Sequence, residues 1–199
     1  MATKYLDLTF TDAVCRAQKQ YYGRAGNIAG APERDPLSQA EAEFIAARDS
    51  FYLGSISESG WPYIQHRGGP QGFLRVMNGT TLVFADYKGN RQLLSTGNVS
   101  VNDRVALFLM DYKNRERLKI LGHARIEDAR KHPELTEQFT DPKMRSSVER
   151  LVFIDVVSFD WNCPKYIMPR YSLEEVEEHV GPLRARIAEL EAKLHTVKL

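Results

Sequence analysis

The sequence has little of several features that mark special classes of protein. Its 199 residues include only two cysteines, Cys15 and Cys163, which are too far apart for a CxxC pair and too few for a disulfide framework. This scarcity favours a reducing, cytoplasmic setting. No apolar run is long enough to cross a bilayer, and the first ten residues lack the apolar core of a signal peptide. We therefore expect a cytoplasmic protein with no membrane segment.

An excess of charge of one sign is also missing. The 27 lysines and arginines nearly balance the 26 aspartates and glutamates, so the formal net charge is +1. This balance gives no general attraction to nucleic acid or to anionic membranes. The basic residues 113–117 are interpreted as a solvated hairpin tip, because no aromatic platform for RNA bases accompanies them. We expect no nucleic-acid partner.

Familiar catalytic and metal-binding motifs are absent as well. The chain contains no GxSxG elbow, no Walker loop and no GxGxxG fingerprint. His132 and the acidic residues near it lack the spacing of a zinc site. His123 lies within a strand pattern and is interpreted as structural, and Cys163 as an inert thiol. No metal is expected, and no catalytic residue is assigned.

Hairpin signals dominate the middle of the chain. Alternating apolar segments are separated by short turns, among them Asn78-Gly79, the strongest short hairpin signal. They predict strands at residues 51–57, 61–67, 73–76, 80–85, 104–111, 117–128 and 151–161. Strands in mostly antiparallel order with few residues between them favour a closed or nearly closed barrel. A doubly wound sheet would need a helix after every strand, and this chain lacks them.

Helical spacing appears at the ends of the barrel segment and in its crossovers. We expect a first helix over residues 10–22, and a second that starts with a Ser38 and Glu41 capping box and ends near Arg48. A short helix should cover residues 129–139. A further amphipathic segment, after residue 91, has Leu93 and Leu94 to bury.

The C-terminal residues 171–199 form a separate amphipathic helix in this interpretation. Ser172 and Glu175 have capping-box spacing, and Gly181-Pro182 should interrupt or kink the helix. Its apolar residues alternate four and three positions apart, as in a coiled-coil seam: Val176, Val180, Leu183, Ile187, Leu190, Leu194 and Val197. The helix either lies on its own barrel or pairs with another helix across a dimer.

A polar loop, residues 86–91, follows the apolar strand and precedes a short helix. The first turn of a helix offers free backbone N–H groups and a positive dipole end, which together bind anions. Lys88 and Arg91 add two cations, and Asn90 can cap the helix or bind an oxygen. The loop is therefore either a phosphate site or a surface turn that is basic.

A second polar group stands at the end of the strand over residues 61–67. Alternation directs Gln65 and Arg67 to one face and His66 to the other. The simplest interpretation is a structural histidine and an edge arginine. Gly68 and Gly69, however, have no side chains and would let a flat ligand lie against the backbone.

Four segments, in order and spacing, resemble the flavin-nucleotide-binding split barrels related to pyridoxamine 5′-phosphate oxidase: WPYIQHRGGPQGFLRV, LVFADYKGNRQLLSTGN, RVALFL and LKILGHARI. The resemblance covers residues 38–170, which leaves residues 1–37 as an N-terminal helix and loop. It implies a mainly β, α+β fold: an antiparallel split β-barrel of the FMN-binding type, followed by the C-terminal helix.

The resemblance also implies a cofactor site and a partner. FMN would lie at a homodimer interface, its ring system along the second barrel strand and its ribityl-phosphate end in the polar loop. The residues implied to bind FMN are Gln65, His66, Arg67 and Gly68 on the strand, Asp86, Tyr87, Lys88, Asn90 and Arg91 in the loop, and Trp161 and Lys165 near the end of the barrel.

The sequence departs from the oxidase proper in three places. Gly89, Asn90 and Arg91 stand where the oxidase has Ser-Arg-Lys, Gln65 replaces a strand arginine, and no Arg-x-His segment follows Trp161. These departures argue against vitamin B6 as substrate. We expect an FMN-dependent oxidoreductase that acts on a small molecule by two-electron transfer. The alternatives are a non-catalytic flavin-binding module (a store, sensor or stress protein) and a split barrel that has lost FMN and binds haem or nothing.

Overall fold

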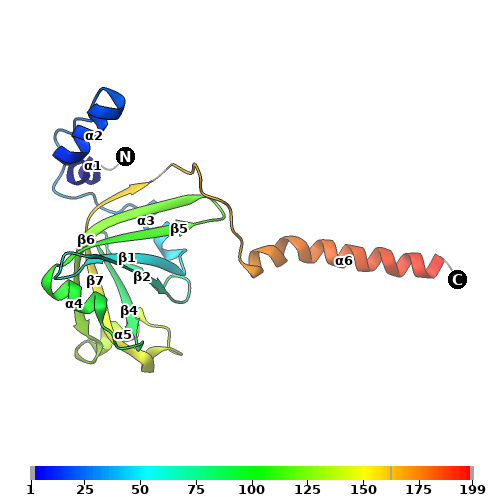
Figure 1. The fold of residues 1–199 in the computed structure, drawn as a ribbon. Helices are drawn as coiled ribbons and strands as arrows, with labels where there is room; N and C mark the ends of the chain where they lie inside the picture. Colours follow the sequence, from blue (N-terminus) through cyan, green and yellow to red (C-terminus); the bar gives the residue numbers. More distant parts are fainter. Residues whose placement is uncertain (1–2, 162, 198–199) are drawn as a thin grey trace. The chain divides into compact units, whose positions relative to one another are not determined.

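A computed structural model describes residues 3–161 and 163–197 (Figure 1). Its strands join in one seven-stranded sheet with the order β2-β1-β5-β6-β7-β4-β3. Their bounds are β1 Ser50–Ile56, β2 Pro62–Gly68, β3 Arg75–Asn78, β4 Thr81–Tyr87, β5 Arg104–Asp111, β6 Glu116–Asp128 and β7 Val148–Trp161. The strands and hairpins predicted from the sequence are confirmed.

The sheet curls until its two ends meet. Strand β2 is an edge strand and β4 lies next to the opposite edge, yet Arg67 of β2 forms an ion pair with Asp86 of β4. Inside the sheet, the ring of Phe51 on β1 packs edge-on against Phe84 on β4, with centroids 5.3 Å apart. The two edge strands, β2 and β3, are not hydrogen-bonded to each other, so the barrel is open between them. The fold is therefore a split β-barrel, as predicted.

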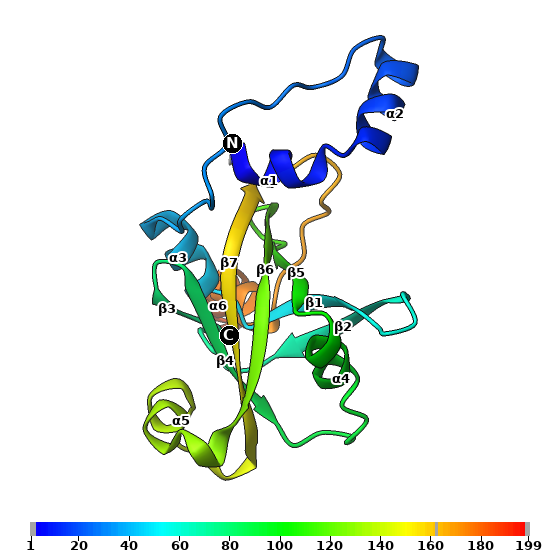
Figure 2. The same ribbon diagram turned by 90° about the vertical axis from the view of Figure 1, so that its left-hand side faces the viewer.

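Strands β4 and β7 are both apolar and are buried on both faces. One face of β4 and β7 turns into the barrel, where Leu82 and Ile154 are fully buried. The other face lies against α5 (Figure 2), and there Val83 and Phe153 belong to one buried cluster with Phe139. Burial on both faces explains why these strands are continuous apolar runs rather than alternating ones.

The helices are α1 Thr3–Thr9, α2 Asp12–Tyr22, α3 Gln39–Ala46, α4 Leu94–Val101, α5 Pro133–Phe139 and α6 Leu173–Val197, with short 3-10 turns at Ala129–Lys131 and Arg145–Ser147. The capping box at the start of α3 is confirmed: Ser38 accepts from the helix backbone and Glu41 accepts from the Ser38 N–H. The capping box of α6 is present too, between Ser172 and Glu175.

The helix predicted over residues 10–22 is confirmed as α2, which Thr11 caps. A further helix, α1, precedes it and was not predicted; Asp35 accepts from two of its backbone N–H groups.

Two other helical predictions are corrected. Leu93 and Leu94 are not buried but 47% and 46% exposed, since α4 begins only at Leu94. The predicted interruption at Gly181-Pro182 is wrong, because α6 continues through Pro182, an exposed residue where water can solvate the carbonyl that loses its partner. The alternative, a kink at this point, stays a prediction. The side chain of Val197, the last residue of the predicted seam, lies outside the described residues.

The described residues divide into two compact units. The larger takes in Met1–Met110 and Arg117–Cys163 and contains the barrel; the smaller takes in Asp111–Glu116 and Pro164–Leu199. Within the smaller unit, Lys113 Nζ lies 3.3 Å from Glu175 Oε1 in the first turn of α6. None of the described helices is both long enough and apolar enough to span a bilayer.

Candidate functional site

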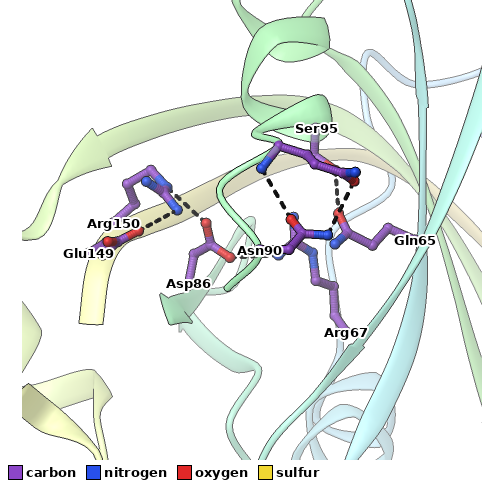
Figure 3. Close-up of polar contacts among 8 residues, drawn as sticks. Gln65, Arg67, Asp86, Asn90, Ser95, Glu149 and Arg150 are labelled. Atoms are coloured by element: carbon purple, nitrogen blue, oxygen red, sulfur yellow. Dashed lines mark hydrogen bonds and ion pairs between the residues drawn. The ribbon is translucent and has the colours of Figure 1, made fainter. Parts of the chain in front are cut away.

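A polar cavity of about 200 Å³ lies where β2, the end of β4, the following loop and the first turn of α4 come together. Arg150 of β7 completes its wall (Figure 3). The lining residues are Tyr63, Gln65, Arg67, Asp86, Tyr87, Gly89, Asn90, Arg91, Gln92, Leu93, Leu94, Ser95, Thr96 and Arg150. Six residues that the sequence suggested for a cofactor therefore share one cavity: Gln65, Arg67, Asp86, Tyr87, Asn90 and Arg91.

Strand β2 presents alternate side chains to the cavity. Tyr63, Gln65 and Arg67 line it, in keeping with the two-residue period of a strand. Gln65 Oε1 accepts a hydrogen bond from Ser95 Oγ at 2.8 Å. Because Ser95 is buried in the first turn of α4, this bond fixes the strand to the helix that closes the cavity.

A cluster of charged side chains forms the floor between β2, β4 and β7. Asp86 accepts from Arg67 Nη1 at 2.5 Å and from Arg150 Nε at 2.8 Å, and Arg150 also contacts Glu149 at 3.0 Å (Figure 3). The Asp86 side chain is only 9% exposed. One carboxylate therefore orients two arginines that come from different strands.

The loop after β4 holds an unusual backbone. Arg91 and Leu93 both adopt left-handed conformations, with φ of 62° and 53°, although neither is glycine. Asn90 Oδ1 accepts from the Gln92 N–H at 3.1 Å, which shapes the turn between them. Such non-glycine outliers cost about 1 kcal/mol or more each, and they cluster at functional sites.

The start of α4 is open to an anion. Its N-cap residue, Leu93, provides no side-chain hydrogen bond, so the first N–H groups of the helix lack the usual side-chain acceptor. Arg91, which lines the cavity, forms no ion pair within the described part of the chain. The Arg67 Nε is buried with no hydrogen-bond partner among the described residues. These free donors suit a phosphate-bearing ligand.

Four other suggested residues lie elsewhere. His66 points to the other side of β2, where its ring packs edge-on against Tyr52 at 5.7 Å. Gly68 ends β2 near the carbonyl of Asp49, and Lys88 is tied through its N–H to the Ser147 carbonyl; neither lines the cavity. Lys165 belongs to the smaller unit, where its ammonium lies over the ring of Tyr166.

Trp161 joins the end of β7 to α3. Its Nε1 donates to Glu41 Oε1 at 2.6 Å, and its ring packs edge-on against Phe44 at 4.7 Å. Burial raises the pKa of Glu41, but hydrogen bonds from Ser38 and Trp161 outweigh burial and hold that pKa below its usual value. The position of Trp161 therefore indicates a structural contact.

We expect Trp161→Phe to lower the free energy of unfolding by about 1 kcal/mol at pH 7, the contribution of one hydrogen bond. Glu41 has a depressed pKa in the folded state, so its contribution is present above pH 4.5 and is lost as the pH falls further. The difference between the variant and the parent protein should therefore shrink below pH 4.5. Urea unfolding at several pH values measures it. Trp61→Phe, at an exposed tryptophan, is the control, and a difference that stays constant down to pH 3 would contradict this role.

Sequence reasoning missed Arg150, Ser95 and Tyr63. Arg150 lies 64 residues after Asp86, and no local motif connects them. The two are direct neighbours in the register of β4 and β7. The one available signal was that oppositely charged residues often face each other across paired strands. Using this signal requires the pairing of β4 and β7 to be known first.

The described residues contain no group of three or more His, Cys, Asp or Glu side chains able to hold a metal ion. The strand order and the ion pair between β2 and β4 define a split β-barrel. Residues 37–154 match the family model of pyridoxamine 5′-phosphate oxidase, and the chain belongs to this family.

Comparison with solved structures gives several matches at low identity. HupZ from Group A Streptococcus is 12% identical (TM-score 0.49; 68% of this chain and 99% of that chain). General Stress Protein 26 from Bacillus anthracis is 14% identical (0.47; 60% and 88%). An FMN-binding protein from Syntrophomonas wolfei is 8% identical (0.43; 60% and 81%). Comparison with curated proteins gave no match.

Proposed function

We propose that the protein binds FMN in this cavity and acts as an oxidoreductase on a small molecule. The observation that carries the proposal is the convergence of the strand donors, the Arg67–Asp86–Arg150 cluster and the uncapped start of α4 on one cavity. Bound flavin supplies two-electron chemistry that no side chain provides.

The lining residues would divide between the phosphate end of the cofactor and the rest of the molecule. The left-handed loop, Arg91 and the first N–H groups of α4 would hold the phosphate dianion. Gln65 and Tyr63 on β2 would offer polar groups to the remainder of the molecule. Arg67, held by Asp86, would add positive charge between them without being free to move away.

The reaction would run without a protein acid or base. Asp86 is the carboxylate of the cavity lining. Both of its oxygens are occupied by arginines, and hydride transfer directly to flavin needs no carboxylate base. The same feature suits a non-catalytic flavin carrier, which is the second candidate.

A homodimer with flavin at the shared interface is part of the proposal, together with a cytoplasmic location. A second hollow beside the cavity is formed by the tip of the β1–β2 hairpin and by α4, with the apolar side chains of Leu93, Leu94 and Val101 exposed. An exposed apolar surface of this kind next to a binding site favours contact with a second copy of the chain.

The purified protein should be yellow and should release about one FMN per chain, identified by mass. Visible absorption before and after addition of FMN measures this. A colourless protein that does not take up added FMN would contradict the proposal. For the reaction, bleaching of the flavin by NADH or NADPH under anaerobic conditions is expected, and a bound flavin that no donor reduces would favour the carrier.

A further inference from the structure

The residue Gln65 is held at both its backbone and its side-chain amide. Its backbone pairs with Leu53 in the ladder between β2 and β1. Its amide oxygen, Oε1, accepts a hydrogen bond from Ser95 Oγ at 2.8 Å (Figure 3). Ser95 is only 2% exposed and lies in the first turn of α4. Gln65 therefore enters the cavity in a fixed position, with its oxygen directed at Ser95.

The amide nitrogen of Gln65 is left for a ligand. A carboxamide carries two N–H donors on its nitrogen and its acceptor sites on the oxygen. Among the residues that the structure describes, Gln65 Nε2 has no hydrogen-bond partner, although Gln65 lines the cavity. Because Ser95 occupies the oxygen, the group that Gln65 offers to a bound molecule is a donor.

The position of Ser95 favours this orientation of the amide over the flipped one. The free N–H groups at the start of α4 form the positive end of the helix dipole. The oxygen is the negative end of the amide dipole, so it is stabilised beside the first turn of the helix. A flipped amide would bring the Nε2 hydrogens against that positive end. Ser95 and the start of α4 therefore determine together which half of the amide faces the cavity.

We propose that Ser95 is a positioning residue, which turns the Gln65 amide so that Nε2 donates a hydrogen bond to a carbonyl oxygen on the ring of bound flavin. The inference rests on the proposed function and deepens it. Reduction makes the ring carbonyl oxygens richer in electrons, so a donor already in place stabilises the reduced ring more than the oxidised one. Ser95 thereby raises the reduction potential of a flavin that it does not touch.

The reduction potential of FMN bound to the full chain tests the proposal. Ser95→Ala frees the amide to rotate, so reduced FMN should lose about threefold to tenfold more affinity than oxidised FMN, the effect of one hydrogen bond. The potential should then fall by about 15–30 mV. Ser95→Thr keeps the hydroxyl and should keep the potential. Ser50→Ala, where the lost hydroxyl bonds Asp49 outside the cavity, is the matched control.

A double-mutant cycle separates positioning from a purely structural role. Gln65→Met removes the amide and keeps a side chain of similar size. If Ser95 acts through Gln65, Ser95→Ala should shift the potential in the parent chain but not in the Gln65→Met background. Equal shifts in both backgrounds, or no shift in either, would overturn the proposal. A parent chain that binds no flavin would refute the proposed function and this inference with it, so the two failures are distinguishable.

Discussion

Replacing Asp86 by asparagine should lower the free energy of unfolding by about 3 kcal/mol, the low end of the range for breaking a buried ion pair. The change keeps the size of the side chain but removes the charge that two arginines share. Arg67 and Arg150 are only 14% and 19% exposed, so each would keep a poorly solvated charge and repel the other. The low end applies because these arginines line a cavity that water reaches.

Urea unfolding of the two proteins measures this loss. Asp7→Asn, in the exposed Lys4–Asp7 pair, is the matched control and should change stability by less than about 1 kcal/mol. Adding Arg67→Gln to Asp86→Asn should recover part of the loss, because Arg67, unlike Arg150, has no second carboxylate partner among the described residues. If Asp86→Asn behaves like Asp7→Asn, the cluster does not hold the strands of the site together.

The fold was predictable because short sequence signals determine where its turns and helices begin. The Asn78-Gly79 turn and the capping box at Ser38 and Glu41 each fix a few neighbouring residues, and both are found where the sequence places them. Barrel closure followed from the number and spacing of strands. Helix α1 escaped detection because it is short and its partner, Asp35, lies some thirty residues away.

The site was predictable only in the parts that are contiguous in sequence. Gln65 and Arg67 lie two residues apart on one strand, so the alternation of a strand predicts that both face the same side. Asn90 and Arg91 lie in one loop, where the residue types indicate a turn that can bind an anion. Arg150 depends on the register of β4 and β7, which the sequence does not state. Leu93 and Leu94 look like core residues by hydropathy, yet the left-handed backbone at Leu93 delays the helix and leaves both exposed. These exceptions lie around the cavity, where local preference yields to the geometry of the site.

The Arg91→Ala variant should bind FMN about tenfold or more weakly, because a charge-assisted contact contributes roughly 1.5 kcal/mol at an exposed position. The effect should depend on the phosphate. Riboflavin has the same ring and ribityl chain but no phosphate, so its affinity should change little. Titration of the apoprotein by flavin fluorescence gives both dissociation constants. A parallel loss for both ligands would mean that the substitution disturbs the loop rather than a phosphate contact.

Two further variants separate the effect of the Arg91 charge on FMN affinity from the effect of its backbone conformation. Arg91→Lys keeps the charge and should retain most of the FMN affinity, whereas Arg91→Gly removes the charge and relieves the left-handed strain at φ 62°. If the strained backbone alone shaped the site, glycine would be tolerated; if the charge binds phosphate, glycine should be as weak as alanine. Arg104→Ala, at an exposed arginine that does not line the cavity, should leave FMN affinity unchanged. Equal FMN affinity in Arg91→Ala and Arg104→Ala would show that the loop is a basic turn and that the phosphate binds elsewhere.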